Sequence, residues 1–371
     1  TTPEELTAAT DAAAEAFTTW RDTSVCVRQR YMFKLRDLIV QHEQQIVDAI
    51  VQENGKVVAD AKGSVFRGLE VVEFSCGIAN ALQGETLEQL SKDVDTYSYR
   101  QPLGVVAGIT PFNFPAMITC WMIPVATVCG NTIVIKPSER TPGATMILAR
   151  LIKEAGIPDG VVNIVHGAHD TVNFICDEPR IKAVSFVGSN TAGEYIHDRA
   201  TKHGKRVQAN MAAKNHGTIL PDADKEATLN QLAGAAFGAA GQRCMALSTA
   251  VFVGDAKEWL PELAEKVLGY CACHDILPGM LKIADHPEDM VSERARLHGP
   301  QGDKEEAMIL HKLPAGLSAL LPVAATGKLD RMLRQRFDLT LSLPSGASPV
   351  VRATVIGVVR TLAEPNRATV F

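Results

Sequence analysis

The chain has 371 residues, of which 46% are hydrophobic and 21% charged, with a formal net charge of −5. This length favours two or three folding units with a large core. The weakly acidic balance argues against nucleic acid or an anionic membrane surface as a partner. No apolar run reaches the roughly 20 residues that a transmembrane helix needs, so we expect a soluble globular protein.

The first residues, TTPEELTAATDAAAEAF, contain early acidic side chains and no arginine. This composition matches neither a secretory signal nor an amphipathic transit segment. The eight cysteines have no regular spacing of the kind that marks a disulfide framework. They favour a reducing compartment.

Hydrophobic periodicity distinguishes two regions of the chain. From about residue 7 to 90, apolar residues recur at intervals of three and four, which predicts long surface helices. From about 100 to 220, β-rich runs alternate with helical segments; the runs include GVVAGI, NTIVIK, VVNIVHG, IKAVSFVG, RVQAN and HGTIL. This alternation predicts an α/β fold, a doubly wound, Rossmann-like parallel sheet with helices on both faces. Its ligands should bind at the carboxyl ends of the strands.

From about Gly269 onward, the residues show no periodicity that predicts helices or strands. We therefore predict amino-terminal helices with a nucleotide-binding α/β domain in 1–217, the start of a second domain in 218–268, and an unassigned part in 269–371. The segment CACH at 271–274 holds two cysteines and a histidine without a second ligand cluster, so we predict no metal site.

Two loops after predicted strands carry polar candidates. Asn113 stands between prolines in PFNFP, where a rigid amide could donate to a developing oxyanion; the alternative is a stiff turn that caps a helix. Lys136 and Glu139 in KPSERTP follow the next strand, where a carboxylate can hold ribose hydroxyls. The alternative there is a solvated ion pair at a helix start.

Two further segments complete the candidate set. Gly188 and Ser189 precede a helix expected to open near Thr191, and free amides at such a start suit a pyrophosphate, although the pattern is not GxGxxG. Cys244, in GAAGQRCMALS, is a candidate nucleophile because Arg243 places positive charge beside it and its own amide could serve as an oxyanion donor. The alternative is a buried thiol, which we predict for the other seven cysteines.

Five segments together resemble the aldehyde dehydrogenase superfamily: PFNFPAMI, KPSERTPGATM, SFVGSNTAGEYI, GKRVQANMAAKNHG and GAAGQRCMALSTA. The resemblance covers about residues 1–268 and is nearest to the branch that acylates coenzyme A. It implies the superfamily's fold, here with an incomplete catalytic domain, because residues after about 268 do not follow the family pattern.

The resemblance also implies roles. Cys244 would attack the aldehyde carbon, with Asn113 and the Cys244 amide stabilising the oxyanion. Arg67 and Arg243 would bind a carboxylate on the substrate, a pairing that is strong and oriented. The alternative for Arg67, which the residues alone favour, is an arginine on the surface of a helix. Hydride would pass to NAD and leave a thioester. The implied cofactor cleft is lined by Phe112, Lys136, Glu139, Arg140, Gly188 and Ser189.

Asn210 stands where most of the superfamily has a glutamate that activates water, and an amide cannot act as a general base. Coenzyme A, attacking as a thiolate, is then the expected acyl acceptor. The implied reaction converts methylmalonate semialdehyde or malonate semialdehyde to propionyl-CoA or acetyl-CoA, in valine and thymine catabolism. Ala212 replaces a family glycine, where its methyl group could crowd the cofactor or be absorbed.

The implied assembly is a homo-oligomer, a tetramer, in the mitochondrial matrix of a eukaryote or the cytoplasm of a bacterium. The segment that the family uses for assembly has no counterpart after residue 268. Two alternatives stay open: a catalytically impaired variant that keeps NAD binding or subunit interaction, and another aldehyde dehydrogenase that uses coenzyme A or water.

Overall fold

The computed structural model describes residues 1–213, 215–238, 243–273 and 369–370. Most of the predicted third part, 269–371, lies outside these ranges. The chain forms two compact units, one of residues 1–54 and 61–211, and one of Gly55–Asp60 with the chain from Ala212 onward. In the described ranges, no helix has the length and apolar character needed to cross a membrane.

The first unit is built on a sheet of five parallel strands in the order β5-β4-β3-β6-β7. Every residue of β3 and β4 is buried, which explains why both read as continuous hydrophobic runs. The winding direction reverses between β3 and β6, so the sheet has a switch point there. The strands are β3 Val105–Ile109, β4 Thr132–Lys136, β5 Val162–Ile164, β6 Ile181–Val187 and β7 Arg206–Asn210.

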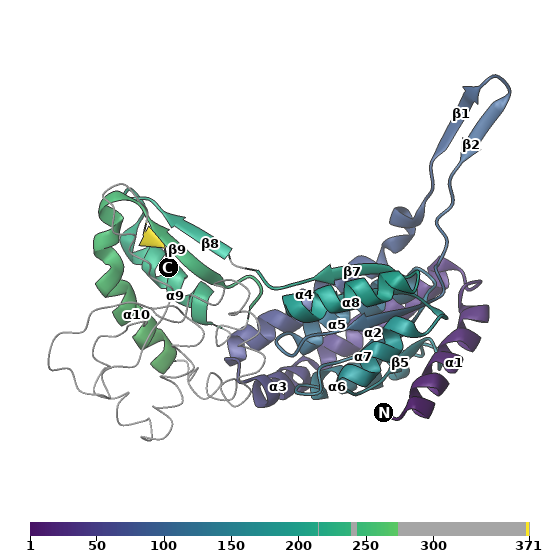
Figure 1. The fold of residues 1–371 in the computed structure, drawn as a ribbon, viewed down its shortest axis with the longest axis horizontal. Helices are drawn as coiled ribbons and strands as arrows, with labels where there is room; N and C mark the ends of the chain where they lie inside the picture. The colour runs from purple at the N-terminus through teal and green to yellow at the C-terminus, as the bar shows by residue number, and fades with distance from the viewer. Residues whose placement is uncertain (214, 239–242, 274–368, 371) are drawn as a thin grey trace. The chain divides into compact units, whose positions relative to one another are not determined.

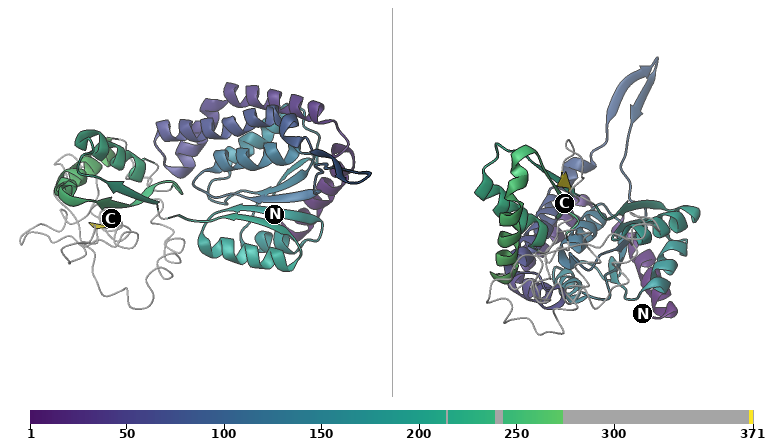
Figure 2. Two further views of the ribbon diagram at one scale, coloured as in Figure 1. Left: turned by 90° about the horizontal axis from the view of Figure 1, so that it is seen from above. Right: turned by 60° about the vertical axis from the view of Figure 1, so that its left-hand side comes forward.

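Helices cover both faces of this sheet, as predicted (Figure 1; Figure 2). On one face lie α1 Pro3–Trp20, α7 His169–Asp177 and α8 Asn190–Lys202, which share a core with the strands. On the other face lie α5 Pro115–Val128 and α6 Gly143–Glu154, with α2 Val25–Gln41 and α3 Glu43–Asn54 packed against them. Met122 of α5 approaches β3 so closely that a Cβ at Gly108 would lie 2.8 Å from its sulfur. The predicted doubly wound fold is confirmed for this unit.

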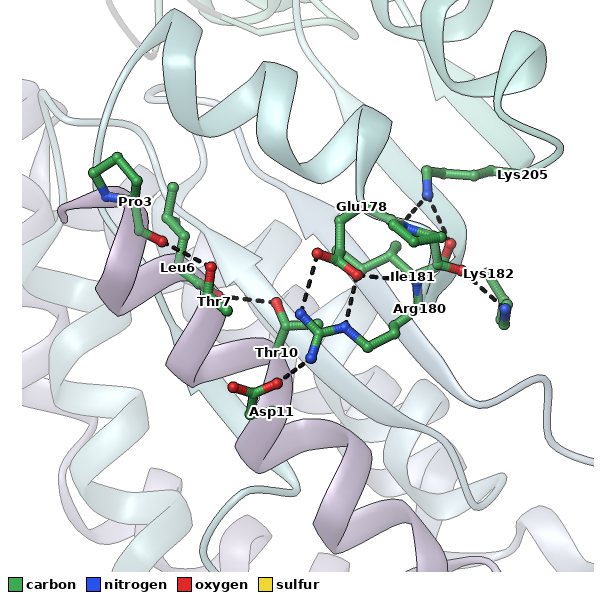
Figure 3. A network of polar contacts seen from close by, with 11 residues as sticks. Pro3, Leu6, Thr7, Thr10, Asp11, Glu178, Arg180, Ile181, Lys182 and Lys205 are labelled. Atoms are coloured by element: carbon green, nitrogen blue, oxygen red, sulfur yellow. Dashed lines mark hydrogen bonds and ion pairs between the residues drawn. The ribbon is translucent and has the colours of Figure 1, made fainter.

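A polar network ties α1 to the amino end of β6 (Figure 3). Arg180 donates to Glu178 at 2.6 Å and pairs with Asp11 of α1. Lys205 donates to the carbonyl oxygens of Ile181, at 2.8 Å, and of Glu178. Hydrogen bonds from Arg180 lower the pKa of Glu178 below its usual value. Because the network lies at the amino ends of the strands, opposite their ligand-binding edge, its role is to hold the layers together.

The structure differs from the prediction at the end of the helical region that was expected from about residue 7 to 90. Residues 86–97 form an antiparallel hairpin of β1 Thr86–Ser91 and β2 Val94–Tyr97 that follows α4 Val58–Cys76 and the short helix η1 Ile78–Leu82. Every residue of both strands is exposed, and the hairpin projects from the first unit (Figure 1). Leu87 and Leu90 have helical spacing, but the chain turns at Asp93, whose φ is 63°. Pairing with β2, in which Val94, Thr96 and Tyr97 are β-prone, therefore prevails over the helical spacing in β1.

The second unit contains the sheet β10-β9-β8. Its strands are β8 Asn215–Ile219, β9 Leu247–Phe252 and β10 Thr369–Val370, and its helices are α9 Lys225–Phe237, η2 Gly254–Trp259 and α10 Leu260–Cys273. Packing of α9 on α10 buries Ala233, Phe237 and Val267. The run HGTIL, predicted as part of the doubly wound sheet, instead pairs with β9 as β8. The local pattern identified a strand, but the identity of its partner depends on tertiary packing.

Candidate functional site

The loops after β3 and β6 leave the sheet at its switch point, since these strands are neighbours with Ile109 opposite Phe186. The first loop carries Phe112 and Asn113, and the second carries Gly188 and Ser189. The Ser189 hydroxyl accepts a hydrogen bond from the amide of Ala192 at 3.3 Å and caps α8, which begins at Asn190. The predicted strand, Gly-Ser turn and helix are thus confirmed, and the start of α8 suits an anion.

The carbonyl oxygen of Phe112 accepts two hydrogen bonds. The Asn54 side-chain amide donates at 3.0 Å and the Thr141 hydroxyl donates at 3.0 Å. Both donors are buried. The guanidinium of Arg140 lies 5.9 Å from the centre of the Phe112 ring. These contacts join the loop that carries Asn113 to the loop that follows β4. Two of the residues that make them, Asn54 and Thr141, were not among the site residues predicted from the sequence.

Glu53, the neighbour of Asn54, caps α6. Its two carboxylate oxygens accept hydrogen bonds from the amide of Gly143 at 3.1 and 3.0 Å. A Cβ at Gly143 would lie 2.7 Å from Glu53 Oε1, so glycine permits this close approach. Burial raises the pKa of Glu53, and the Gly143 hydrogen bond opposes that rise. The end of α3 therefore supports both loops at this edge of the sheet.

Lys136 ends β4 and is buried, with three acceptors around its ammonium group. It donates to the Gly167 carbonyl at 2.7 Å, to the Pro137 carbonyl at 2.9 Å and to Glu139 Oε2 at 3.1 Å. Burial acts to raise the pKa of Glu139, but a backbone hydrogen bond and Lys136 together hold it below its ordinary value. The Glu139 side chain is 54% exposed. An ionised, accessible carboxylate thus stands at the carboxyl edge of the sheet.

Two predicted residues of the first unit lie at its surface. Asn210 ends β7 and is exposed, and its carbonyl oxygen accepts a hydrogen bond from the amide of Gly188 at 3.1 Å. Arg67 lies on α4 with a side chain that is 64% exposed and paired with Glu70 at 3.0 Å. An exposed helix arginine of this kind leaves its guanidinium accessible to a ligand.

Cys244 lies in the second unit, in the turn before β9. The Asn215 amide donates to the carbonyl of Cys244 at 2.6 Å and to that of Ala246 at 3.0 Å. The turn is closed by a hydrogen bond from the Ala246 amide to the Arg243 carbonyl at 3.2 Å. Asn215 therefore fixes the backbone on both sides of the candidate nucleophile. Residues 239–242 of the motif lie outside the described ranges.

The cysteines differ in accessibility. Cys244 is half-buried, whereas Cys120 and Cys176 are buried, and burial raises the pKa of Cys120 to about 12 and that of Cys176 to about 11. Cys26 on α2 is exposed and Cys129 is half-buried, so the prediction that the other seven thiols are buried is wrong for these two. Cys244 is thus among the thiols that a reagent can reach.

Arg243 forms an ion pair with Asp60, which lies in the first turn of α4 and belongs to the same unit. Lys56 lies nearby, with 2% of its surface exposed. Burial lowers the pKa of Lys56 to about 7, and the charges of Asp60, Arg243 and Cys244 also act on it. The sequence pattern singled out neither Lys56 nor Asp60, because a lysine and an aspartate near a helix start are common surface residues.

No cluster of metal-ligating side chains occurs in the part of the chain that the structure describes. The CACH segment at 271–274 lies where the structure describes no side chains.

Residues 1–270 match the family model described as "Aldehyde dehydrogenase family". The chain belongs to the aldehyde dehydrogenase family. It is 62% identical over 264 residues to the human methylmalonate-semialdehyde/malonate-semialdehyde dehydrogenase [acylating], mitochondrial, a match that covers 71% of this chain and 49% of the relative. The chain therefore spans about half the length of the curated relatives it matches.

Two solved aldehyde dehydrogenase structures share the fold. A methylmalonate-semialdehyde dehydrogenase from Oceanimonas doudoroffii matches with a TM-score of 0.70 and 41% identity, covering 83% of this chain and 64% of that one. A putative methylmalonate-semialdehyde dehydrogenase from Sinorhizobium meliloti, complexed with NAD, matches with a TM-score of 0.72 and 36% identity, covering 84% and 64%. The resemblance inferred from the five motifs is confirmed.

Proposed function

We propose that this chain carries out the coenzyme-A-dependent oxidative decarboxylation of methylmalonate semialdehyde or malonate semialdehyde with reduction of NAD. The observation that carries the proposal is Cys244, half-buried, held by Asn215 and adjacent to Arg243, in a chain 62% identical to the human acylating enzyme over 264 residues. An accessible thiol beside a cation suits attack on a carbonyl whose substrate also bears a carboxylate.

The switch-point edge of the first unit suits NAD. The start of α8 with Gly188 and Ser189 fits a pyrophosphate, and the exposed carboxylate of Glu139, held by Lys136, fits ribose hydroxyls. Phe112 and Arg140 complete the set of residues that would hold the cofactor. When bound, NAD supplies the hydride acceptor.

In the proposed mechanism the Cys244 thiolate adds to the aldehyde carbon, and the C=O electrons move to oxygen. Asn113 and the Cys244 amide would donate to that oxyanion. As the oxyanion re-forms the carbonyl, the same carbon would give up its hydride, for which bound NAD would be the acceptor, and a thioester would remain on Cys244. Arg67 and Arg243 would hold the substrate's carboxylate during these steps.

The thioester carries a β-carboxylate, so the bond to that group can break with release of carbon dioxide. Its electron pair passes into the thioester carbonyl as an enolate, which the same two donors would stabilise before a proton returns to carbon. Asn210 cannot act as a general base, so we propose that the thiolate of coenzyme A attacks the thioester and releases the Cys244 thiolate.

We also propose a homo-oligomer, in the mitochondrial matrix if the source is a eukaryote and in the cytoplasm if it is a bacterium. The exposed apolar side chains of the β1–β2 hairpin, among them Leu87, Leu90 and Tyr97, support self-association because they offer a hydrophobic surface next to unpaired strand edges.

The decisive experiment follows NADH formation from malonate semialdehyde, with and without coenzyme A. We expect turnover with coenzyme A, at most about one NADH per chain without it, and neither with Cys244→Ser. Equilibrium binding of NAD, measured separately, distinguishes an impaired variant from a chain that binds no cofactor. Absence of NADH in both arms, in a sample that binds NAD, would rule out the proposed activity.

A further inference from the structure

One side-chain amide binds two main-chain carbonyls in the turn that carries Cys244. The amide nitrogen of Asn215 donates to the carbonyl oxygen of Cys244 at 2.6 Å and to that of Ala246 at 3.0 Å. All three residues belong to the second unit. An asparagine amide nitrogen carries two hydrogens, so one side chain can satisfy both carbonyls. Asn215 therefore holds two peptide groups of the turn at once.

The start of β8 explains how Asn215 reaches this turn. β8 and β9 are parallel, and Asn215 lies opposite Leu247, whereas the next residue, His216, lies opposite Thr249. The register thus advances by two residues on β9 for one on β8, as at a β-bulge. Bulges redirect a side chain and interrupt regular pairing. The Asn215 side chain accordingly extends the contact between the two segments to the residues that precede β9.

The hydrogen bonds of the turn also determine the direction of the Cys244 amide. The described ranges contain no cis peptide bond, and in a trans peptide the N–H and C=O groups point in opposite directions. The Arg243 carbonyl accepts a hydrogen bond from the Ala246 amide across the turn at 3.2 Å. The N–H of Cys244 belongs to the same peptide group as that carbonyl, so it points out of the turn.

This direction depends on Asn215 because little else anchors the turn. The side chain of Met245, which follows Cys244, is 61% exposed. The bond that closes the turn comes from Ala246, whose own carbonyl is bound by Asn215. Without the Asn215 amide, the peptide groups on both sides of Cys244 can rotate. The direction of the Cys244 N–H would then no longer be fixed.

We propose that Asn215 is a positioning residue that presets the Cys244 amide as an oxyanion donor before any ligand binds. It acts through the main chain. When the thiolate adds to an aldehyde, the C–S bond forms, the C=O electrons move to oxygen, and the preset amide donates to that oxygen. A donor already in place needs no reorganisation as the charge develops. The inference deepens the proposed function, on which its reaction rests.

The test compares two neutral reagents that modify thiols by different routes. p-Nitrophenyl acetate transfers its acetyl group through a tetrahedral oxyanion and releases p-nitrophenolate. Iodoacetamide alkylates by displacement of iodide, without an oxyanion. Neither reagent requires an aldehyde, NAD or coenzyme A. The native chain is treated with each, and the rates at Cys244 and at the exposed Cys26 are read from peptide masses. We expect the ratio of acetylation to alkylation to be at least about tenfold higher at Cys244.

Variants of Asn215 separate the oxyanion donor from the thiol. Asn215→Ala should lower the Cys244 ratio about tenfold or more, with the iodoacetamide rate changed less than about threefold, since one displaced donor affects only the reaction through an oxyanion. Asn215→Asp, which keeps the shape but replaces the donors with acceptors, should lower the ratio as much. Asn215→Gln keeps an amide and should lower it less. Asn230→Ala removes an exposed asparagine that donates to Glu226 in the same unit, and as the matched control it should leave the ratio unchanged.

Equal ratios at Cys244 and Cys26 in the unaltered chain would overturn the proposal without any variant. An Asn215→Ala ratio equal to that of the unaltered chain would also overturn it, even if both rates fall together, because Asn215 would then act on the thiol or on folding. If Asn215→Ala does not fold, the same comparison is made with Asn215→Asp. The NADH assay is independent. A chain without turnover but with an Asn215-dependent ratio would refute only the proposed activity, and turnover with an Asn215-independent ratio would refute only the role of Asn215.

Discussion

Asn54 donates from its side-chain amide to the main-chain carbonyl oxygen of Phe112 at 3.0 Å, across 58 residues of sequence. The hydroxyl of Thr141 donates to the same oxygen. This carbonyl belongs to the residue before Asn113, the proposed oxyanion donor. The position of Asn113 therefore depends on a helix end and a loop that are distant in sequence.

Replacing the side-chain amide of Asn54 should weaken the binding of NAD. In Asn54→Ala the Phe112 carbonyl loses one of its two buried donors, at a cost of about 1–3 kcal/mol. We expect NAD affinity to fall about threefold to tenfold in an equilibrium titration, with Thr141→Val acting in the same direction. Gln41→Ala, at an exposed position near the end of α2, is the control. Unchanged NAD affinity in both Asn54→Ala and Thr141→Val would contradict the assigned role.

Lys56 should make stability depend on pH. Its pKa is lowered from 10.5 to about 7 by burial, so between these values the unfolded chain binds a proton that the folded chain does not. The free energy of unfolding therefore rises with pH across this window. Below about pH 7 the folded chain carries the whole destabilisation that comes from burying the protonated Lys56 side chain. We expect Lys56→Met to raise the free energy of unfolding by about 2–4 kcal/mol at pH 6.5, measured with urea. The gain should vanish near pH 10.5, and a gain that does not change with pH would exclude this origin.

The network around Arg180 should stabilise the first unit without affecting the site. Arg180→Ala removes its hydrogen bonds to Glu178 and its pair with Asp11, and we expect a loss of about 1–2 kcal/mol after allowance for partial exposure. Asp11→Asn should cost less than about 1 kcal/mol.

The Arg180 effect has a definite pH dependence. Hydrogen bonds from Arg180 hold the pKa of Glu178 below its ordinary 4.5. Their stabilisation is therefore present above about pH 4.5 and is lost as pH falls through the lowered pKa. Thermal unfolding at pH 7 and pH 3 measures this, and an Arg180→Ala effect of equal size at both values would show that Glu178 is not involved.

Arg67 should raise kcat/KM only for substrates that carry a carboxylate. Its exposed guanidinium already pairs with a carboxylate at 3.0 Å, which shows that its geometry permits such contacts. We expect Arg67→Ala to lower kcat/KM for malonate semialdehyde at least tenfold and to leave propionaldehyde nearly unchanged, since a charge-assisted hydrogen bond contributes about 1.5–3 kcal/mol. Arg36→Ala removes a comparable exposed ion pair and serves as the control. Equal losses on both aldehydes would refute a role in carboxylate binding.

Several features were predictable because their signals are local. β3 and β4 are continuous apolar runs, and Ser189 stands directly before α8 as a helix cap. Other predictions failed where one local pattern is compatible with more than one structure. Leu87 and Leu90 have helical spacing in a hairpin, and β8 resembles its predecessors although it pairs in a different sheet.

By itself, the sequence determined the order of strands and helices from β3 to β7, the loops that carry Asn113, Glu139 and Cys244, and membership of the aldehyde dehydrogenase family. Tertiary structure alone decided that Asn54 binds Phe112 and that Asp60 pairs with Arg243. It also decided that Lys56 is buried. The physical reason is that burial and long-range polar contacts arise from packing between distant segments, so they leave no periodic signal in the residues around them.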